Sequence, residues 1–174
     1  MNGVRRFLPF VLLSLLAVGP AGGQPAGSAL RGHDSNAPVD VAADRIEVQD
    51  RADRAIFSGN VDARQGSLRL TAPRLVVAYA SSGGIDIKRL EASGGVTLRT
   101  PSETATSQYA IYDLDRRLVT MIGAVRLVQG INRVQGGRLV LDLDSGRAVM
   151  DGGGAQAAGG RVTGRFTVPR RGGN

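Results

Sequence analysis

Apolar and polar residues alternate along most of this chain, from residue 39 to residue 168, and turn-forming residues interrupt the alternation every few positions. Successive side chains of a β-strand point to opposite faces of a sheet, so this pattern predicts many short antiparallel strands. No segment keeps the helical period over three turns. The 25 glycines also favour turns over long helices. We therefore expect an all-β domain.

The alternating segment is built from a repeated unit. One marker is a glycine followed two positions later by valine, at Gly59, Gly94 and Gly123, with a degenerate copy at Gly152; the spacings are 35, 29 and 29 residues. A second marker is a short strand-like stretch, and its copies are 45–48, 74–77, 109–112 and 138–141, at spacings of 29, 35 and 29 residues, with a looser copy at 165–168. Repeated units of this kind stack side by side and share one continuous core.

The parity of the strands predicts which side chains face that core, because residues two apart share a face. The glycine-containing strands contribute Ala55, Phe57, Val61, Ala63, Leu90, Ala92, Val96, Leu98, Val119, Met121, Val125 and Leu127. The other strands contribute Ile46, Val48, Leu75, Val77, Tyr79, Ala110, Tyr112, Leu114, Leu139, Leu141 and Leu143. The opposite face carries Arg64, Arg69, Arg99 and Arg126, and also apolar residues that the pattern does not explain: Ile56, Val76, Ile111, Ile122 and Val140.

Two repeated features each have a structural and a functional interpretation. The glycines inside strands indicate bulges that curve the sheet, or they leave room for a ligand. The paired aspartates at the turns, Asp113 with Asp115 and Asp142 with Asp144, could cap the backbone or bind calcium. Their place at repeated turns favours capping.

The N-terminus is typical of a secretory signal peptide. Arg5 and Arg6 precede an apolar run, 7–18, and small residues follow at 19–23, which predicts cleavage near Gly23. The alternative is that the run stays uncleaved as a membrane anchor. This alternative is disfavoured, because the run is shorter than the roughly 20 residues that span a bilayer. Residues 24–37 then form a flexible leader, and residues 169–174 form a basic flexible tail. Export across the inner membrane places the mature protein in the periplasm.

Charge and composition narrow the function. Loss of residues 1–23 removes two arginines and no acid, which lowers the formal net charge from +7 to +5. Arginine is the better bidentate partner for phosphate, and in a secreted protein this favours anionic lipids and glycolipids over nucleic acid. The chain has no cysteine, its one histidine, His33, lies in the leader, and nucleotide-binding and hydrolase motifs are absent. We expect no enzyme activity, no metal and no cofactor.

Three motifs resemble the OstA-like domain of the LptA family of lipopolysaccharide-transport proteins: residues 42–48, 55–61 and 70–75. The resemblance covers residues 38–168 and implies a twisted β-jellyroll that is open at its ends. It also implies that lipid A acyl chains lie along the apolar interior and that protomers join head to tail by strand addition. The implied partners are lipopolysaccharide, an inner-membrane LptC-like anchor and an outer-membrane LptD-like translocon.

The resemblance and the parity together select the ligand-binding residues, which are Phe57, Val61, Val77, Val96, Tyr112, Met121, Val125 and Leu141. Two rival hypotheses stay open at this stage. One is an LptC-like protein that its N-terminus retains in the inner membrane. The other is a secreted structural β-repeat protein with a dry core and no lipid ligand.

Overall fold

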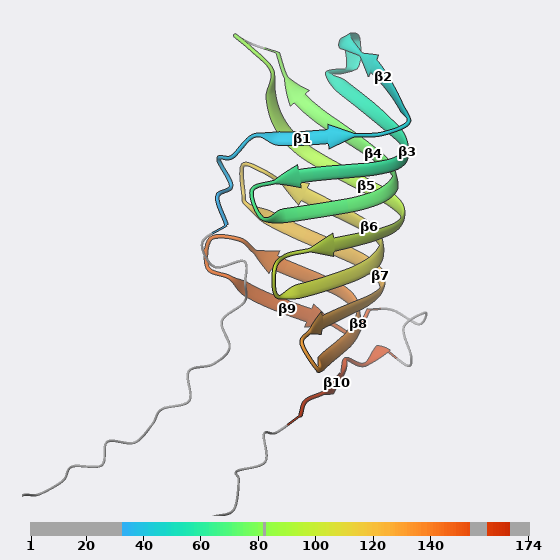
Figure 1. The fold of residues 1–174 in the computed structure, drawn as a ribbon, viewed down its shortest axis with the longest axis vertical. Coiled ribbons are helices and arrows are strands. Elements are labelled where there is room, and N and C mark those ends of the chain that lie inside the picture. The colour runs from blue at the N-terminus through green and yellow to red at the C-terminus, as the bar shows by residue number, and fades with distance from the viewer. Residues whose placement is uncertain (1–32, 82, 154–159, 168–174) are drawn as a thin grey trace, which may run out of the picture.

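The computed structural model describes residues 33–81, 83–153 and 160–167, and these form one ten-stranded antiparallel sheet (Figure 1). A 3-10 turn, η1 (Asp50–Ala52), lies near the beginning of this part of the chain. The strands are β1 (Val39–Ala42), β2 (Arg45–Gln49), β3 (Arg54–Gln65), β4 (Leu68–Ala80), β5 (Asp86–Arg99), β6 (Glu103–Asp113), β7 (Leu118–Gln129), β8 (Asn132–Asp142), β9 (Arg147–Asp151) and β10 (Thr163–Arg165). The expected all-β class is confirmed.

The six long strands, β3 to β8, pair in sequence order, each antiparallel to the next. Each end of the series is completed by two short strands. β1 and β2 pair with the two halves of β3, and β9 and β10 pair with the two halves of β8. The stack therefore begins and ends with a strand that is interrupted where the long strands bend.

The long strands bend at a row of bulges that contains the repeated glycines. In β3, β5 and β7 two consecutive residues with positive φ oppose one residue of the next strand, and the register shifts there. The pairs are Gly59–Asn60, Gly94–Gly95 and Gly123–Ala124. Bulges bend a strand and increase its twist, so this row folds the sheet along one line. The bulge interpretation of the glycines is confirmed.

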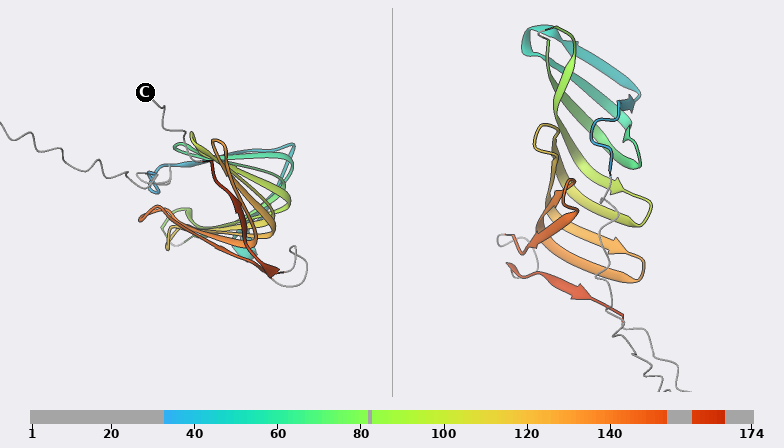
Figure 2. Two further views of the ribbon diagram at one scale, coloured as in Figure 1. Left: turned by 90° about the horizontal axis from the view of Figure 1, so that it is seen from below. Right: turned by 90° about the vertical axis from the view of Figure 1, so that its left-hand side faces the viewer.

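The folded sheet has the shape of a V, with the row of bulges at its corner and hairpin loops along its open side (Figure 2). The apolar side chains fill the space between its two halves. The most deeply buried are Leu75, Val119, Met121 and Leu139, which have 0% of their surface exposed. One continuous cluster of buried residues runs from Val61 to Leu143, so the predicted shared core is present.

The acidic turns cap the backbone, as the capping interpretation predicts. The Asp113 carboxylate accepts a hydrogen bond from the Arg116 amide at 2.9 Å. The Asp142 carboxylate accepts hydrogen bonds from the amides of Asp144 and Ser145, each at 3.0 Å. These bonds satisfy backbone donors that the hairpins leave free.

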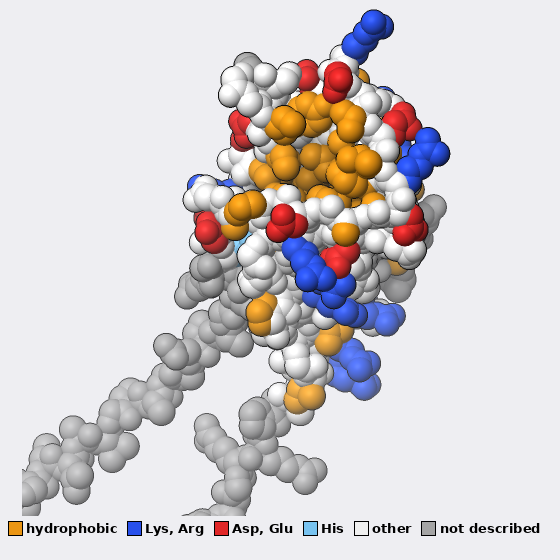
Figure 3. Space-filling model, turned by 45° about the horizontal axis from the view of Figure 1, so that its top comes forward, with side chains coloured by type: hydrophobic (Ala, Val, Ile, Leu, Met, Phe, Trp, Pro, Cys, Tyr) orange, Lys and Arg blue, Asp and Glu red, His pale blue; other side chains and the backbone are white. Residues whose placement is uncertain are grey.

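Two residues assigned to the interior are not there. Ile46 and Val48 of β2 are 56% and 57% exposed, because no further strand or loop of the described residues covers the face of this short terminal strand. Figure 3 shows apolar side chains gathered on the surface at the β2 end of the stack. The predicted alternation would bury Ile46 and Val48 in a strand with a neighbour on each side, but β2 pairs only with β3 and lies at the edge of the sheet.

Four of the five unexplained apolar residues of the outer face lie in one cross-strand row, whereas the fifth, Ile122, pairs with Tyr109 and Arg138 outside it and is 41% exposed. Ile56, Val76, Ile111, Val140 and Val149 lie in register across β3, β4, β6, β8 and β9. Ile56 is buried and the others are partly buried. Neighbours in a sheet shield one another in this way, so the row stabilises the strand pairing from outside.

Candidate functional site

The predicted ligand-binding residues all border the space between the two halves of the V. Val61, Val77, Val96, Tyr112, Met121, Val125 and Leu141 are buried. Phe57, near the β2 end, is partly buried and packs against the same core. The parity prediction therefore brought these side chains together correctly.

The two halves contribute different members of this set. Phe57, Val77, Tyr112, Met121 and Leu141 come from the half that contains β2 and β9. Val61, Val96 and Val125 follow the bulges and belong to the half that contains β1 and β10. A ligand between the halves would therefore contact both sets at once.

In this structure the interior is filled by its own side chains. An apolar cavity of about 20 Å³ lies near the open side, bordered by residues that include Val39, Leu70, Leu98 and Val119. Sites for small molecules typically measure roughly 300–1,000 Å³. The halves of the V must separate before an acyl chain can lie between them.

A polar group closes the open side above this cavity, and Gln65 is its centre. Gln65 is buried at the end of β3, and its side-chain oxygen accepts a hydrogen bond of 2.8 Å from the Tyr112 hydroxyl. The same oxygen lies 3.2 Å from Nε2 of His33. The side-chain nitrogen donates to the backbone oxygens of Ser35 and Ala37, at 2.9 and 3.0 Å. The end of the leader thus lies against the core.

Burial gives the Tyr112 hydroxyl the properties of a neutral donor. Its removal from water disfavours the phenolate and raises the pKa of Tyr112 above its ordinary value. At neutral pH the hydroxyl is therefore protonated and can donate to Gln65. Sequence reasoning did not select Gln65, although this polar residue ends an otherwise apolar set, Val61 and Ala63, on one face of its strand.

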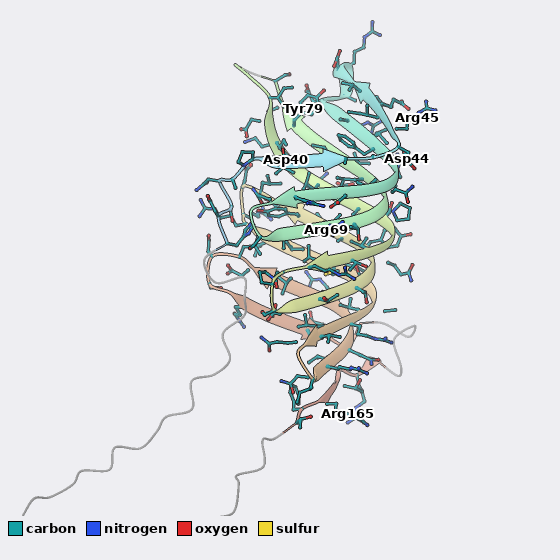
Figure 4. The ribbon with its side chains drawn as sticks, in the orientation of Figure 1. Asp40, Asp44, Arg45, Arg69, Tyr79 and Arg165 are labelled. Carbon is teal, nitrogen blue, oxygen red and sulfur yellow. The ribbon has the colours of Figure 1, made fainter. Side chains whose placement is uncertain are left out.

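Several arginines lie in neighbouring register positions on the outer face of the half that contains β1, among them Arg69, which Figure 4 labels. Arg64 and Arg69 both contact the Asp62 carboxylate at 2.8 Å, and they hold the pKa of that carboxyl well below its usual range. Arg99 pairs in register with Arg69, and Arg126 lies further along the same half. Neither Arg99 nor Arg126 forms an ion pair with the described part of the chain.

Two other kinds of site are absent from residues 33–81, 83–153 and 160–167. No group of three acidic or histidine side chains is arranged to hold a metal ion there. No helix in this part of the chain has the length and apolar character needed to cross a bilayer. The predicted signal peptide, most of the leader and the tail lie outside the described residues.

Residues 40–147 match the family model described as the LptA/(LptD N-terminal domain) LPS transport protein. An uncharacterized protein of Rhizobium meliloti is 34% identical over 132 residues, which are 72% of this chain and 68% of that protein. The lipopolysaccharide export system protein LptH of Pseudomonas aeruginosa is 25% identical over 135 residues, 75% of each chain.

The fold has a counterpart among solved structures. The crystal structure of LptH, described as the LptA-homologous periplasmic component of the lipopolysaccharide transport device of Pseudomonas aeruginosa, superimposes with a TM-score of 0.68. It covers 78% of this chain and 99% of its own, at 20% sequence identity. The likeness confirms the expected jellyroll fold.

Proposed function

This chain belongs to the family of LptA and LptD N-terminal domain lipopolysaccharide transport proteins, and from this we propose that it carries lipopolysaccharide through the periplasm. The finer proposal is that it bridges the inner and outer membranes for outer-membrane assembly, and that lipid A acyl chains lie between the two halves of the V. The observation that supports the route of the chains is the continuous apolar interior from Val61 to Leu143.

The physical requirement for such a carrier is an apolar path. Each methylene group that leaves water is stabilised by about 0.8 kcal/mol, so a lipid with several acyl chains cannot cross an aqueous space uncovered. No covalent bond changes during this transfer, and we therefore propose a carrier with no enzyme activity and no cofactor.

Loading would require the two halves of the V to separate about the corner. The bulges there already hold residues such as Gly94 and Gly95 in conformations with positive φ, without a regular ladder of backbone hydrogen bonds. Separation along this line would leave the strand pairing within each half intact. The cost in lost side-chain contacts would be offset by contacts with the acyl chains that enter.

The arginines give the lipid phosphates a place to bind. Arg99 and Arg126 lie on the outer face without an acidic partner among the described residues. Guanidinium groups bind phosphate in a bidentate manner. We propose that such arginines meet the phosphates while the acyl chains stay inside.

Assembly would use the two ends of the stack. β2 leaves Ile46 and Val48 exposed at one end, and Phe166 is 68% exposed beside β10 at the other. Edge strands with unpaired backbone groups pair readily with other strands. We propose head-to-tail contacts between copies, and pairing of the terminal copies with an LptC-like anchor and an LptD-like translocon.

Photo-crosslinking tests the proposed ligand and its location. A photoreactive side chain at interior positions should capture lipopolysaccharide through its acyl portion; these positions are Phe57, Val61, Val77, Val96, Tyr112, Met121, Val125 and Leu141. The same probe at the outward positions Arg64, Arg99 and Arg126 should capture much less of that portion. Equal yields on both faces would contradict the interior location, and no capture at either face would support a structural protein with a dry core.

The LptC-like alternative differs in its N-terminus. An exported and cleaved chain should have a mass that begins near residue 24 and should be recovered with the periplasmic fraction. An intact N-terminus in the membrane fraction would support the anchored protein instead.

A further inference from the structure

The side chain of Gln65 is bound chiefly by the end of the leader. A glutamine side chain can donate two hydrogen bonds and accept two. Gln65 makes all four, and three of them are with residues of the leader: His33, Ser35 and Ala37. The fourth is with Tyr112, inside the jellyroll. A residue with 4% of its surface exposed is therefore satisfied chiefly by a segment outside the sheet.

The leader separates two spaces that share Gln65. On the inner side is the apolar cavity of about 20 Å³, and on the outer side is a cleft of about 410 Å³. Ile85, Ile87 and Leu114 line the cleft together with the leader, and both Val39 and Gln65 border both spaces. Removal of residues 33–37 would join the cleft to the core.

The contacts of the leader are of a kind that another molecule can replace. Ser35 and Ala37 contribute backbone carbonyl groups, which are not specific to any side chain. His33 donates to an acceptor through Nε2, which leaves Nδ1 as an acceptor, and Nδ1 is buried without a hydrogen-bond partner among the described residues. A buried polar atom without a partner costs free energy, so the leader is not held optimally.

We propose that Gln65 and Tyr112 form the binding site for the amide linkage of an N-acylated lipid, and that residues 33–37 occupy this site when no lipid is bound. A secondary acyl amide is trans, so its N–H and C=O groups point in opposite directions and only one of them can bind Gln65. Its N–H group donates to the Gln65 oxygen and takes the place of His33, one of the three hydrogen bonds of the leader, while its chain enters the apolar core. An acyl ester and an alkyl ether have no N–H group and replace none of these bonds.

This inference rests on the proposed function, because it identifies which linkage of lipopolysaccharide enters at this point. It predicts a preference for the amide-linked chain over the ester-linked chain. It also predicts that the leader and the lipid compete, since they use the same atoms of Gln65.

The test compares three probes with the same acyl chain length: an N-acylglucosamine, its O-acyl ester counterpart and its alkyl ether counterpart. Affinities for the chain that begins at residue 24 are measured by displacement of a fluorescent N-acyl probe. We expect the amide to bind about fivefold more tightly than either the ester or the ether, which is the effect of roughly one net hydrogen bond. Gln65→Leu should abolish this preference, whereas the matched outer-face variant Gln135→Leu should retain it.

Removal of the leader tests the competition. A chain that begins at residue 38 should bind the amide probe about tenfold more tightly, once a far-ultraviolet spectrum has shown that its sheet is intact. If that chain does not fold, hydrogen exchange supplies the test, because Gln65→Leu and bound amide probe should each increase exchange in residues 33–41 and leave residues 118–129 unchanged.

The outcomes separate this inference from the proposed function. Equal affinities for the three probes, or a preference that survives in Gln65→Leu, would overturn the assignment of Gln65. If lipopolysaccharide still crosslinks to the interior in that case, the transport proposal stands without it. If neither lipopolysaccharide nor any probe binds, both fail.

Discussion

Alanine substitution at two corner glycines distinguishes a structural role from a role in making room for acyl chains. Gly95 and Gly123 have similar backbone conformations, with φ of +96° and +87°. A Cβ atom at Gly95 would have no neighbour within 4 Å, whereas one at Gly123 would lie 2.9 Å from Cβ of Gln108. The two variants therefore share the backbone strain and differ in the steric overlap.

The expected magnitudes follow from these two contributions. An alanine forced to positive φ costs about 1–2 kcal/mol, and reduced freedom of the unfolded chain offsets roughly 0.4–1 kcal/mol of that. Overlap in a packed region adds about 1–3 kcal/mol. We expect the free energy of unfolding to fall by about 1 kcal/mol in Gly95→Ala and about 3 kcal/mol in Gly123→Ala. For a domain of this size these correspond to decreases in Tm of roughly 4 and 10 °C.

Thermal and urea unfolding of both variants measure these changes, and interior photo-crosslinking of lipopolysaccharide supplies the second measurement. The corner explanation predicts a loss of stability that differs between the variants and an unchanged crosslinking yield per folded molecule. The reasoning is wrong if both variants melt like the wild type while the crosslinking yield falls, because the missing side chains would then serve the ligand.

Two further predictions concern the charged face and the C-terminal end. Asp62→Asn should cost less than about 1 kcal/mol at pH 7, because the ion pairs with Arg64 and Arg69 are exposed. Because the pKa of Asp62 is lower in the folded state than in the unfolded state, this stability is present above about pH 4. It is lost as the pH falls below the unfolded-state pKa towards the folded-state pKa. The free energies of unfolding of wild type and variant, measured in urea titrations, should therefore converge as the pH is lowered from 5 to 2. Deletion of residues 160–174 removes β10 and the exposed Phe166, and should abolish self-association and docking to the outer-membrane partner while the other strands stay folded; concentration-dependent oligomers of unchanged size in ultracentrifugation would contradict it.

The sequence predicted one interior set well because of how the bulges count residues. In β3 two residues, Gly59 and Asn60, lie at the corner, so Phe57 before it and Val61 after it keep the same parity. In β4 a single residue, Pro73, lies at the corner. The interior set therefore changes parity there, from Leu70 and Ala72 to Leu75 and Val77. A prediction that assumes a constant period of two therefore identifies the interior residues in only one half of a strand such as β4.

The same count explains which core residues the sequence analysis missed. The missed residues lie in the first halves of β4 and β6. A period of two extended from the second half of each strand back across the corner would have assigned them to the outer face. These are Leu68, Leu70, Ala72 and Ala105. The exposure of Ile46 and Val48 has a different origin, because a residue pattern indicates a face but not whether another element covers it. Likewise Gln65 gained its role from the leader, and contacts over 28 to 32 positions leave no local periodic signal.

The filled interior and the carrier function are compatible because the V is held closed differently at its two sides. At the corner the connection is covalent, and the strands pass through residues with positive φ such as Gly94 and Gly95. At the open side the leader is held by hydrogen bonds to Gln65, with a small cavity beneath it. An empty carrier with exposed acyl-binding surface would aggregate, since large apolar patches in water associate. If the proposed function holds, a carrier that closes over its own side chains would avoid this, and a lipid that supplies a hydrogen bond to Gln65 and apolar contacts would reopen it.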